Sequence, residues 1–469
     1  MAICRIVSKF APKIERNQMN KLIKTVCALF TAVLLLASCM KSDDSSNSTL
    51  YSDTAITNFY FGTLNRYHHT TSSTGADSIY KTTFDGDDYK FSIDQVNHRI
   101  FNTDSLPMGT DVKHMVTYIT TLNNATPYLL SETGDTLFFY SSTDSLDFSR
   151  PRKIEVYASN GVNHTTYTVE VNVHKEDSEQ FIWITHNDSR EIYDLDKMKA
   201  TIINGQLFVY GNKDEKTLGY VTKDGNSWTA LAELDDKNAY SNILNFNNSL
   251  FTIANGALIK SDNGTSWEVV NAAVDVTKLI AASYNELFGL TSDGKMMVSD
   301  DNGVTWEEDL TDTDTGMLPT TETAYVCYPA NMTYYADNIL IAGTSAGVAD
   351  ISSVWRKIVE YDLQGDEKWV YMSRMDNNLF ALPQMENLVM MDYDDGILAW
   401  GIKDGAYTPI YQSRDNGLIW KKSSSYKLPV FFSEDAIFPF CAATDGKEIW
   451  LIGGNGQVWQ GHLNRLSWE

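Results

Sequence analysis

Ser299-Asp300-Asp301-Asn302-Gly303-Val304-Thr305-Trp306 is the stretch that decides the fold of this 469-residue chain. Its pattern, Ser-x-Asp-x-Gly-x-Thr-Trp, predicts a tight β-hairpin. The Asp and Asn side chains can hydrogen-bond to their own backbone, and the Gly supplies a positive φ angle. The Trp then begins the return strand as a large apolar anchor.

Two more copies of this pattern follow the same order of residues. Residues 260–267 have Lys in the first place, and residues 413–420 have Ile before the Trp. The three copies resemble the Asp-box (BNR) hairpin of sialidase-like β-propellers. This resemblance implies a structural role for nine residues: Asp262, Gly264, Trp267, Asp301, Gly303, Trp306, Asp415, Gly417 and Trp420.

A second repeat, a polar turn followed by a short apolar strand, occurs six times, beginning at positions 204, 248, 285, 337, 395 and 446. Each copy is followed by a Trp, namely Trp228, Trp267, Trp306, Trp369, Trp420 and Trp468. The first three are 39 residues apart, the length of a four-stranded propeller blade. We therefore predict an all-β fold with a six-bladed propeller over residues 181–469, with seven blades as the alternative.

Two parts of this repeat region depart from the pattern. Residues 221–228 keep the Gly and the Trp but have Lys223 where the Asp of the box is expected. Residues 181–184, Phe-Ile-Trp-Ile, form an extra apolar strand before the first repeat. We expect this strand to pair with the last repeat and close the ring, because an open ring leaves sheet edges exposed.

Residues 51–175 contain short alternating strands, and Asn160-Gly161 lies between two of them as a hairpin signal. Their length and spacing predict an immunoglobulin-like β-sandwich. Phe91-Ser92-Ile93-Asp94, the run 100–107 and Gly109-Thr110 resemble the N-terminal domain of a Bacteroidales lipoprotein family of unknown function. In that family, this domain precedes a propeller.

The triplet Asp-Ser/Thr-apolar occurs five times between residues 53 and 146 and not in the longer C-terminal region. It resembles the O-glycosylation sequon of exported Bacteroidetes proteins, which implies sugars on Thr54, Ser78, Ser105, Thr136 and Ser145. The alternative is that Asp-Ser and Asp-Thr simply begin turns in a loop-rich domain.

The N-terminal residues indicate export. Lys21 and Lys24 precede an apolar run that ends in Leu36-Ala37-Ser38-Cys39. This end resembles the bacterial lipobox, which implies cleavage before Cys39 and lipidation of its thiol. We expect a signal peptide over residues 1–38, with Met19 as the true start, and a lipid-anchored linker over residues 39–50.

Residues 41–46 of this linker are polar and acidic, and they resemble the export signal of Bacteroidetes surface lipoproteins. The expected location is the outer membrane, at the cell surface, with the periplasmic face as the alternative. The chain has 37 basic and 61 acidic residues and a formal charge of −24. Such a charge repels nucleic acid and anionic lipid, so the membrane is expected as a partner only through the lipid.

The sequence offers little support for catalysis. Sialidases hold the substrate carboxylate with three arginines, and no Arg-Ile-Pro motif stands in this chain. Residues 181–469 contain only Arg190, Arg356, Arg374, Arg414 and Arg465. No nucleophile-elbow, zinc-protease or P-loop pattern occurs, and no metal or cofactor is predicted. We expect Cys327 and Cys441, which lie in different repeats, to be buried free thiols.

These observations favour a non-catalytic protein that binds a glycan. A glycoside hydrolase unlike sialidases is one alternative, because such an enzyme needs only two well-spaced carboxylates. A scaffold for an outer-membrane protein is the other. Trp183, Trp400 and Trp450 are predicted to be core residues, whereas the loops 331–335 and 407–411 are the predicted binding segments.

Overall fold

The structure is a computed structural model that describes residues 49–71, 76–193, 195–330, 335–361, 367–373, 378–430 and 436–467. The signal segment with Met19, the lipidation residue Cys39, Arg374, Trp468 and residues 331–334 of the first predicted binding loop lie outside these ranges. The described residues form two compact units, divided between Asn172 and Val173.

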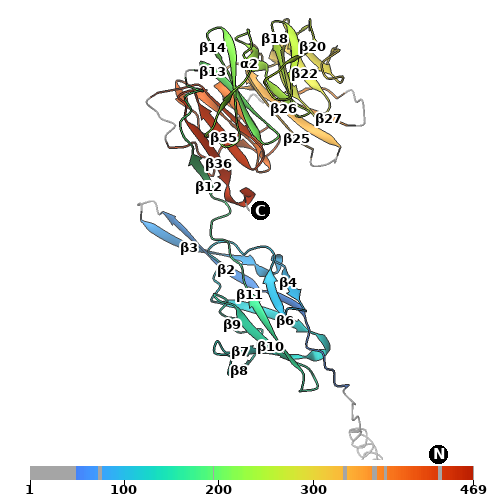
Figure 1. Cartoon of the computed structure of the whole chain (residues 1–469), viewed down its shortest axis with the longest axis vertical. Helices are drawn as coiled ribbons and strands as arrows, with labels where there is room; N and C mark the ends of the chain where they lie inside the picture. The colour runs from blue at the N-terminus through green and yellow to red at the C-terminus, as the bar shows by residue number, and fades with distance from the viewer. Residues whose placement is uncertain are drawn as a thin grey trace, which may run out of the picture. The chain divides into compact units, whose positions relative to one another are not determined.

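The N-terminal unit contains three sheets (Figure 1). The largest has the order β4 (Phe91–Asp94), β5 (Arg99–Asn102), β11 (His164–Glu170), β10 (Arg152–Tyr157), β7 (Thr126–Leu130) and β8 (Leu137–Phe139). A second sheet contains β1 (Ile56–Phe61), β6 (Met115–Thr121) and β9 (Ser145–Leu146). The third is a ribbon of β2 (Thr63–Thr71) and β3 (Asp77–Asp85).

An aromatic cluster joins the first two of these sheets. Phe59 and Phe61 of β1 both lie edge to face with Phe91 of β4, at centroid distances of 4.9 and 5.1 Å. Such edge-to-face pairs stabilise a core beyond the area that they bury. The hairpin predicted at Asn160-Gly161 is confirmed, because β10 pairs antiparallel with β11 and Gly161 has a φ of 70°.

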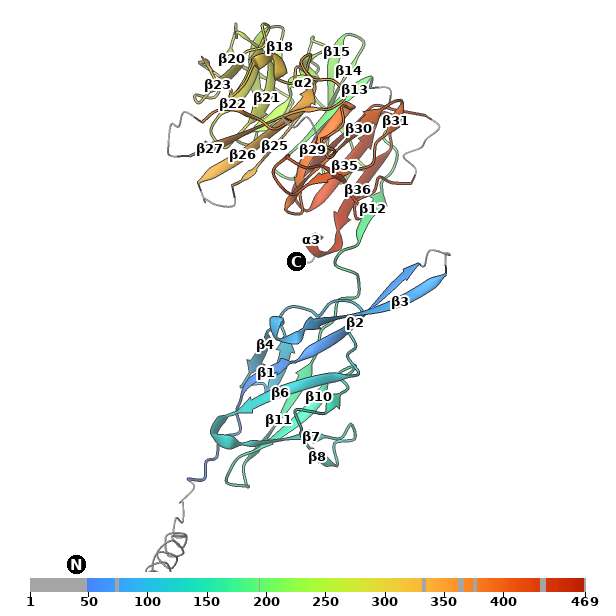
Figure 2. The ribbon, with the colours of Figure 1, turned by 180° about the vertical axis from the view of Figure 1, so that it is seen from behind.

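The C-terminal unit contains six sheets, which we number in chain order (Figures 1 and 2). Sheet 1 contains β13 (Lys197–Ile203), β14 (Gln206–Lys213), β15 (Lys216–Thr222) and β16 (Thr229–Ala230). Sheet 2 contains β17 (Leu244–Phe246), β18 (Ser249–Ala254), β19 (Ala257–Ser261) and β20 (Glu268–Asn271), and the short helix α2 (Ala239–Asn242) precedes it. Sheet 3 contains β21 (Val276–Ala282), β22 (Leu287–Thr291), β23 (Met296–Ser299) and β24 (Glu307–Glu308).

Sheet 4 contains β25 (Thr321–Pro329), β26 (Ala336–Thr344), β27 (Ser353–Glu360) and β28 (Val370–Tyr371). Sheet 5 contains β29 (Glu386–Tyr393), β30 (Gly396–Lys403), β31 (Ala406–Tyr407), β32 (Tyr411–Ser413) and β33 (Lys421–Lys422). Sheet 6 contains β34 (Phe440–Thr444), β35 (Glu448–Gly453), β36 (Val458–Leu463) and β12 (Phe181–Thr185), and the helix α3 (Asn464–Ser467) follows β36. The predicted apolar strand of each repeat is the second strand of its sheet, so those six strand predictions are confirmed.

The six sheets form a closed cycle. The first strand of each sheet contacts the first strand of the next, in the order β13, β17, β21, β25, β29, β34 and back to β13. The strand predicted at residues 181–184 pairs with the last repeat as expected, because β12 runs antiparallel to β36 with Phe181 opposite Leu463. The strand that begins the unit therefore completes the sheet that ends it.

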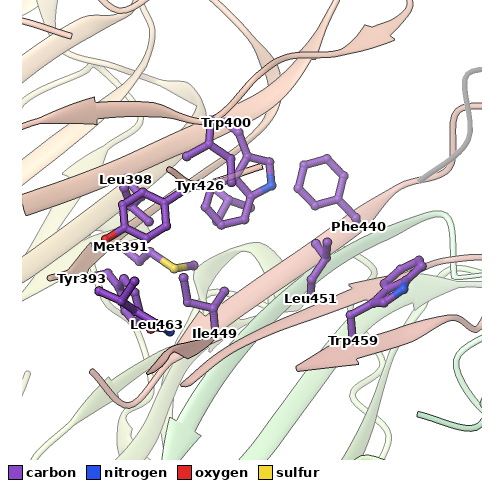
Figure 3. Packing of buried hydrophobic residues seen from close by; sticks show 12 residues of the cluster. Met391, Tyr393, Leu398, Trp400, Tyr426, Phe440, Ile449, Leu451, Trp459 and Leu463 are labelled. Atoms are coloured by element: carbon purple, nitrogen blue, oxygen red, sulfur yellow. Dashed lines mark hydrogen bonds between the residues drawn. The ribbon is translucent and has the colours of Figure 1, made fainter. Parts of the chain in front are cut away.

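Apolar clusters fill the spaces between neighbouring sheets. The cluster between sheets 5 and 6 contains Trp400, Phe440 and Trp459 (Figure 3). Similar clusters join sheets 3 and 4 around Trp355 and sheets 4 and 5 around Trp420. Because each sheet is covered on both faces, strands such as β18 are buried at every position. The core positions predicted for Trp400 and Trp450 are confirmed, whereas Trp183 is only half-buried.

The turns at 299–306 and 413–420 have the same hydrogen bonds. In the first, the Gly303 N–H donates to Ser299 Oγ at 2.8 Å and the Thr305 N–H to Asp301 Oδ1 at 2.8 Å. Trp306 Nε1 donates to the Gly303 carbonyl at 3.1 Å. Residues 413–420 repeat all three contacts, with Asp415 accepting from the Ile419 N–H and Trp420 donating to the Gly417 carbonyl.

The turn at 260–267 differs, and it corrects the role predicted for Asp262. Here the Gly264 N–H donates to Ser261 Oγ, and Asn263 Oδ1 accepts from the Thr265 N–H at 2.9 Å. Asp262 instead accepts from Ser249 Oγ at 2.6 Å. Ser261 is three positions before Gly264, whereas Ser299 is four positions before Gly303. When the two turns are aligned on their Trp residues, Asp262 therefore matches Asp301, although Asn263 is the residue that accepts the hydrogen bond.

The turn at 221–228 has the same shorter form. The Gly225 N–H donates to Thr222 Oγ1 at 3.0 Å, and the Ser227 N–H donates to Asp224 Oδ1 at 2.8 Å. Our interpretation that Lys223 replaces the acid was therefore wrong, because Asp224 supplies the carboxylate. The backbone hydrogen bonds that Asp224 accepts from Ser227 and Asn226 lower the pKa of its carboxyl group.

The glycine of each turn packs against the preceding sheet. Gly303 has a φ of 88°, and a Cβ placed on it would lie 2.1 Å from Leu258 Cδ2 of sheet 2. Gly417 similarly faces Leu340 of sheet 4, at 2.8 Å from its Cδ2 to the added Cβ. The turns therefore fix the approach of neighbouring sheets, and only glycine fits there.

Replacing Gly303 by Ala is expected to lower the free energy of unfolding, because the change adds both backbone strain and a clash with Leu258. Gly294→Ala is the matched control, because Gly294 has a φ of 82° but no atom within 4 Å of an added Cβ. The free energies of unfolding of the two variants should differ by about 1–3 kcal/mol, the usual cost of overpacking a core. Urea unfolding measures both, and equal losses would show that the contact with Leu258 is unimportant.

Asn263→Ala is expected to destabilise the C-terminal unit more than Asp262→Ala. Asn263 holds the turn, whereas the Asp262 side chain is 73% exposed and accepts one hydrogen bond at the surface. The loss for Asn263→Ala should be about 1 kcal/mol, the net value of a typical hydrogen bond. Thermal and urea unfolding of the two variants can be compared directly. A larger loss for Asp262→Ala would restore the original assignment.

Candidate functional site

A cavity of about 200 Å³ lies where the first strands of the sheets converge. Its lining comes from the first strands of five sheets, β13, β21, β25, β29 and β34, and from Tyr240 and Ser241 of α2, the helix that precedes sheet 2. Five of the six sheets and this helix therefore meet at this one place. The lining combines apolar side chains, such as Met390, with several polar and charged groups, which is the usual composition of a ligand site.

Three lysines enter this cavity. Lys197 and Lys199 are alternate residues of β13, so they lie on the same side of the strand. Lys278 comes from β21. Lys199 Nζ donates to the Ser241 carbonyl at 3.1 Å, and Lys278 Nζ donates to the Thr320 carbonyl at 3.0 Å. These two ammonium groups thus have backbone carbonyls as their hydrogen-bond acceptors.

The surroundings of these lysines disfavour their charged forms. Burial, with a smaller contribution from the Lys278 charge, lowers the pKa of Lys199 to about 7. Burial also lowers the pKa of Lys278 to about 8, although the Glu322 carboxylate opposes this shift. Lysine in water has a pKa near 10.4, so the two groups are poised to titrate close to neutral pH.

Glu322 is held at the start of β25 by two contacts. Its Oε2 accepts from the Asn387 N–H at 2.6 Å, and its Oε1 lies 3.6 Å from Lys197 Nζ. Both Glu322 and Asn387 have positive φ angles, 47° and 50°. Such a backbone is uncommon for residues other than glycine, and it often marks a functional site.

Irregular strand pairing explains how these groups reach the cavity. The pairing register shifts between Thr321 and Ala324 in β25, and between Glu386 and Val389 in β29. It also shifts between Val276 and Lys278 in β21. A bulge redirects the side chains next to it, and bulges are frequent beside active sites. Lys278, Glu322 and Asn387 all lie at such shifts.

The other ionisable groups of the lining are neutral near pH 7. Burial raises the pKa of Tyr240 to about 12, with the Glu322 charge adding to the shift. Burial likewise raises the pKa of the Tyr325 hydroxyl and of the Cys441 thiol. Within the described lining, the charged groups are therefore the three lysines and Glu322.

The residues predicted from the sequence lie elsewhere. Asp301, Asp415 and the shorter turns connect the last two strands of their sheets, and they do not line the cavity. In the predicted binding loop 407–411, Thr408 and Ile410 are buried and Tyr407 Oη donates to the Phe438 carbonyl, and the loop does not line the cavity. Tyr335, the described end of the other predicted loop, is 66% exposed.

The arginines are likewise not gathered at one place. Arg356 donates to Asn338 Oδ1, whereas Arg414 and Arg465 both contact Asp394. Cys441 is buried and free as predicted, and Cys327 is free but half-buried. Across the described ranges, no group of three or more His, Cys, Asp or Glu side chains is placed to bind a metal ion.

Among the possible glycosylation residues, Thr136 and Ser145 are exposed, and Thr54, Ser78 and Ser105 are half-buried. No helix in the described parts of the chain has the length and apolar character needed to cross a membrane.

Comparison with known families identifies the architecture. Residues 177–469 match the DUF6242 beta propeller domain, and residues 59–171 match the DUF6242 N-terminal domain, a domain of unknown function. The chain belongs to the DUF6242 family. The predicted β-propeller is thereby confirmed. A search of curated protein sequences gives no match.

Several solved structures align with part of this chain at low similarity. A virginiamycin B lyase from Staphylococcus aureus is 10% identical, with a TM-score of 0.35, over 60% of this chain and 99% of that one. YCF48 from Cyanidioschyzon merolae is 13% identical, with a TM-score of 0.35, over 60% and 99%. An Aleuria aurantia lectin in complex with Fucalpha1-6GlcNAc is 12% identical, with a TM-score of 0.33, over 56% and 91%.

Five residues of the cavity were not predicted from the sequence: Lys197, Lys199, Lys278, Glu322 and Asn387. One signal was available, because Lys197-Met198-Lys199 places two charges on one side of a strand that is otherwise largely apolar. The strand irregularities that bring the other three residues to the same place leave no comparable mark in the sequence.

Proposed function

We propose that this chain is a lipid-anchored outer-membrane protein whose propeller binds a glycan without cleaving it. The cavity carries this proposal. Its described lining offers many hydrogen-bonding groups, among them Tyr240 and the three lysines, but Glu322 is its single carboxylate. Glycoside hydrolysis commonly needs a pair of carboxylates on either side of the bond. A site with one carboxylate, already engaged by Lys197 and Asn387, suits recognition rather than hydrolysis.

The finer architecture is part of the proposal. We assign each of the six sheets to one blade, because their first strands contact one another in a closed cycle. Residues 222–228, 261–267, 299–306 and 413–420 are then Asp-box turns of two lengths. In the N-terminal unit, the two sheets that meet through Phe59, Phe61 and Phe91 support an immunoglobulin-like sandwich.

The first residues of the sequence support the proposed cellular location. Leu36-Ala37-Ser38-Cys39 after a basic and apolar stretch supports lipidation of Cys39, and the polar residues 41–46 support export to the cell surface. A lipid anchor would attach the protein to the membrane despite its charge of −24, since binding then depends on the acyl chains.

Tyr240→Phe is expected to weaken glycan binding roughly three- to tenfold, because it removes one hydroxyl from the cavity. Tyr193→Phe is the matched control, since Tyr193 is 54% exposed and does not line the cavity. The assay is an array of host and dietary glycans probed with the full-length protein, followed by chromatography of any bound glycan. A blank array would favour a protein partner, and released products would favour a hydrolase. Either result would contradict the proposal.

Cys39→Ser is expected to move the protein from the membrane fraction to the soluble fraction and to remove the mass of the acyl chains. Cys27→Ser is the control, because Cys27 lies within the predicted signal peptide. Cell fractionation and intact-mass measurement test both variants. Membrane attachment that survives Cys39→Ser would show that the anchor lies elsewhere.

A further inference from the structure

The geometry points to a ligand that carries a negative charge, a carboxylate or sulfate on a sugar, held in the cavity between the ammonium groups of Lys199 and Lys278. This inference rests on the proposed function in taking the cavity as the glycan site and the ligand as a sugar. It adds the chemical class of that ligand, an acidic rather than a neutral glycan.

The charges in the cavity are paired unevenly. Lys197 lies beside Glu322, so these two groups neutralise each other. Lys199 and Lys278 have backbone carbonyls as acceptors, and none of the ion pairs among the described residues includes either of them. The Glu322 carboxylate also acts on Lys278, but it is already paired with Lys197. Two partly buried ammonium groups that form no ion pair of their own are unfavourable unless another anion is supplied.

The positive charge of the cavity lining is opposite in sign to the net charge of the whole chain. The protein has 61 acidic and 37 basic residues, yet three lysines and a single glutamate line this cavity. Apolar side chains such as Met198, Val389 and Met390 occupy neighbouring positions of the same lining. If the lysines only filled space where the first strands converge, apolar side chains could fill the same space. They would do so without the free-energy cost of desolvating a buried charge.

The backbone that supports the site is irregular. The register shift before Lys278 and the positive φ of Glu322 and Asn387 place charged and polar groups where regular strands would not. Strained residues persist when the surrounding structure holds them, and they are concentrated at binding and catalytic sites. The irregularities therefore mark the same end of the first strands as the lysines do.

The size of the cavity limits what can enter. Its volume of about 200 Å³ is below the roughly 300–1,000 Å³ of most small-molecule sites. An extended polymer would not fit inside, whereas the acidic group of one sugar unit would. A charge-assisted hydrogen bond from each ammonium group to one oxygen would then satisfy both lysines.

The site has a pH dependence with a definite sign. The groups that face Lys199 and Lys278 are Lys197 on the same strand as Lys199, Tyr240 from α2, Glu322 and Tyr325 from β25, and Cys441 from β34. Tyr240, Tyr325 and Cys441 have raised pKa values and stay neutral, so the two lysines are the groups that titrate near neutral pH. An anion binds their protonated forms, so affinity should be greatest near pH 6 and should fall as the pH rises through 7 and 8.

The test is isothermal titration of the full-length protein with glucuronate, glucose and inorganic sulfate at pH 6 and pH 9. We expect glucuronate to bind at least about tenfold more tightly than glucose, sulfate to compete with it, and its affinity to fall at least about tenfold at pH 9. Lys199→Met and Lys278→Met should each weaken glucuronate binding by a similar factor. Lys216→Met is the control, because Lys216 pairs with Glu233 outside the cavity.

The outcomes separate this inference from the proposed function. If neutral glycans bind as well as acidic ones and the lysine variants leave binding unchanged, the inference is wrong and the proposed function stands. If sulfate binds through the two lysines but no sugar does, the anion site is real and the proposed function is wrong. If a lysine variant fails to fold, two measurements on the unaltered protein still test the inference: the pH dependence of glucuronate binding and the competition by sulfate. If glucuronate affinity is the same at pH 6 and pH 9 and sulfate does not compete, the inference is wrong.

Discussion

The pairing of β12 with β36 is the constraint on which the C-terminal unit depends. It brings residues 181–185 into the sheet formed by the last three strands, so the two ends of the unit are joined by backbone hydrogen bonds. Buried Asp394 strengthens this junction, since it accepts from Tyr426 Oη at 2.6 Å and contacts Arg465, which follows β36. Tyr393 Oη also accepts from the Leu463 N–H. Only when the cycle is closed do the first strands of all six sheets surround one axis.

Closure also explains how the two ends of each sheet differ in role. The turns between the last two strands hold neighbouring sheets together through glycines such as Gly303 and Gly417, whose conformation and contacts exclude a side chain. The starts of the first strands carry Lys197, Lys278 and Glu322 instead. The most recognisable sequence motif of this chain, the turn that contains Gly303 or Gly417, therefore serves packing between sheets. The charged residues of the cavity lie on other strands. This separation agrees with the general rule that function belongs to sites and not to folds.

The sequence predicted much of the architecture and little of the site. Patterns that depend on local residues, such as the turns around Gly303 and the apolar strand at 181–184, were interpreted correctly because each is set by a few neighbouring side chains. The turn at 260–267 was assigned to Asp262 because one fewer residue separates Ser261 from Gly264, and a fixed spacing from Trp267 conceals that difference. The cavity could not be predicted, since its residues are up to about 245 positions apart in the chain and converge only through closure. The bulges before Lys278 and around Glu322 also break the alternation from which side-chain direction is inferred.

The cavity lining carries a net positive charge, whereas the whole chain carries a net negative charge. This difference affects which anionic ligands the cavity can bind. The net charge of −24 repels an anion at long range, but salt screens that repulsion within about 8 Å at physiological ionic strength. The attraction of Lys199 and Lys278 acts at short range in a desolvated space, where screening is weaker. A polymer with many charges would meet the full repulsion while offering one group to the cavity. A glycan with a single acidic sugar would meet little repulsion and gain the same contact, so the charge distribution favours sparsely charged ligands over polyanions.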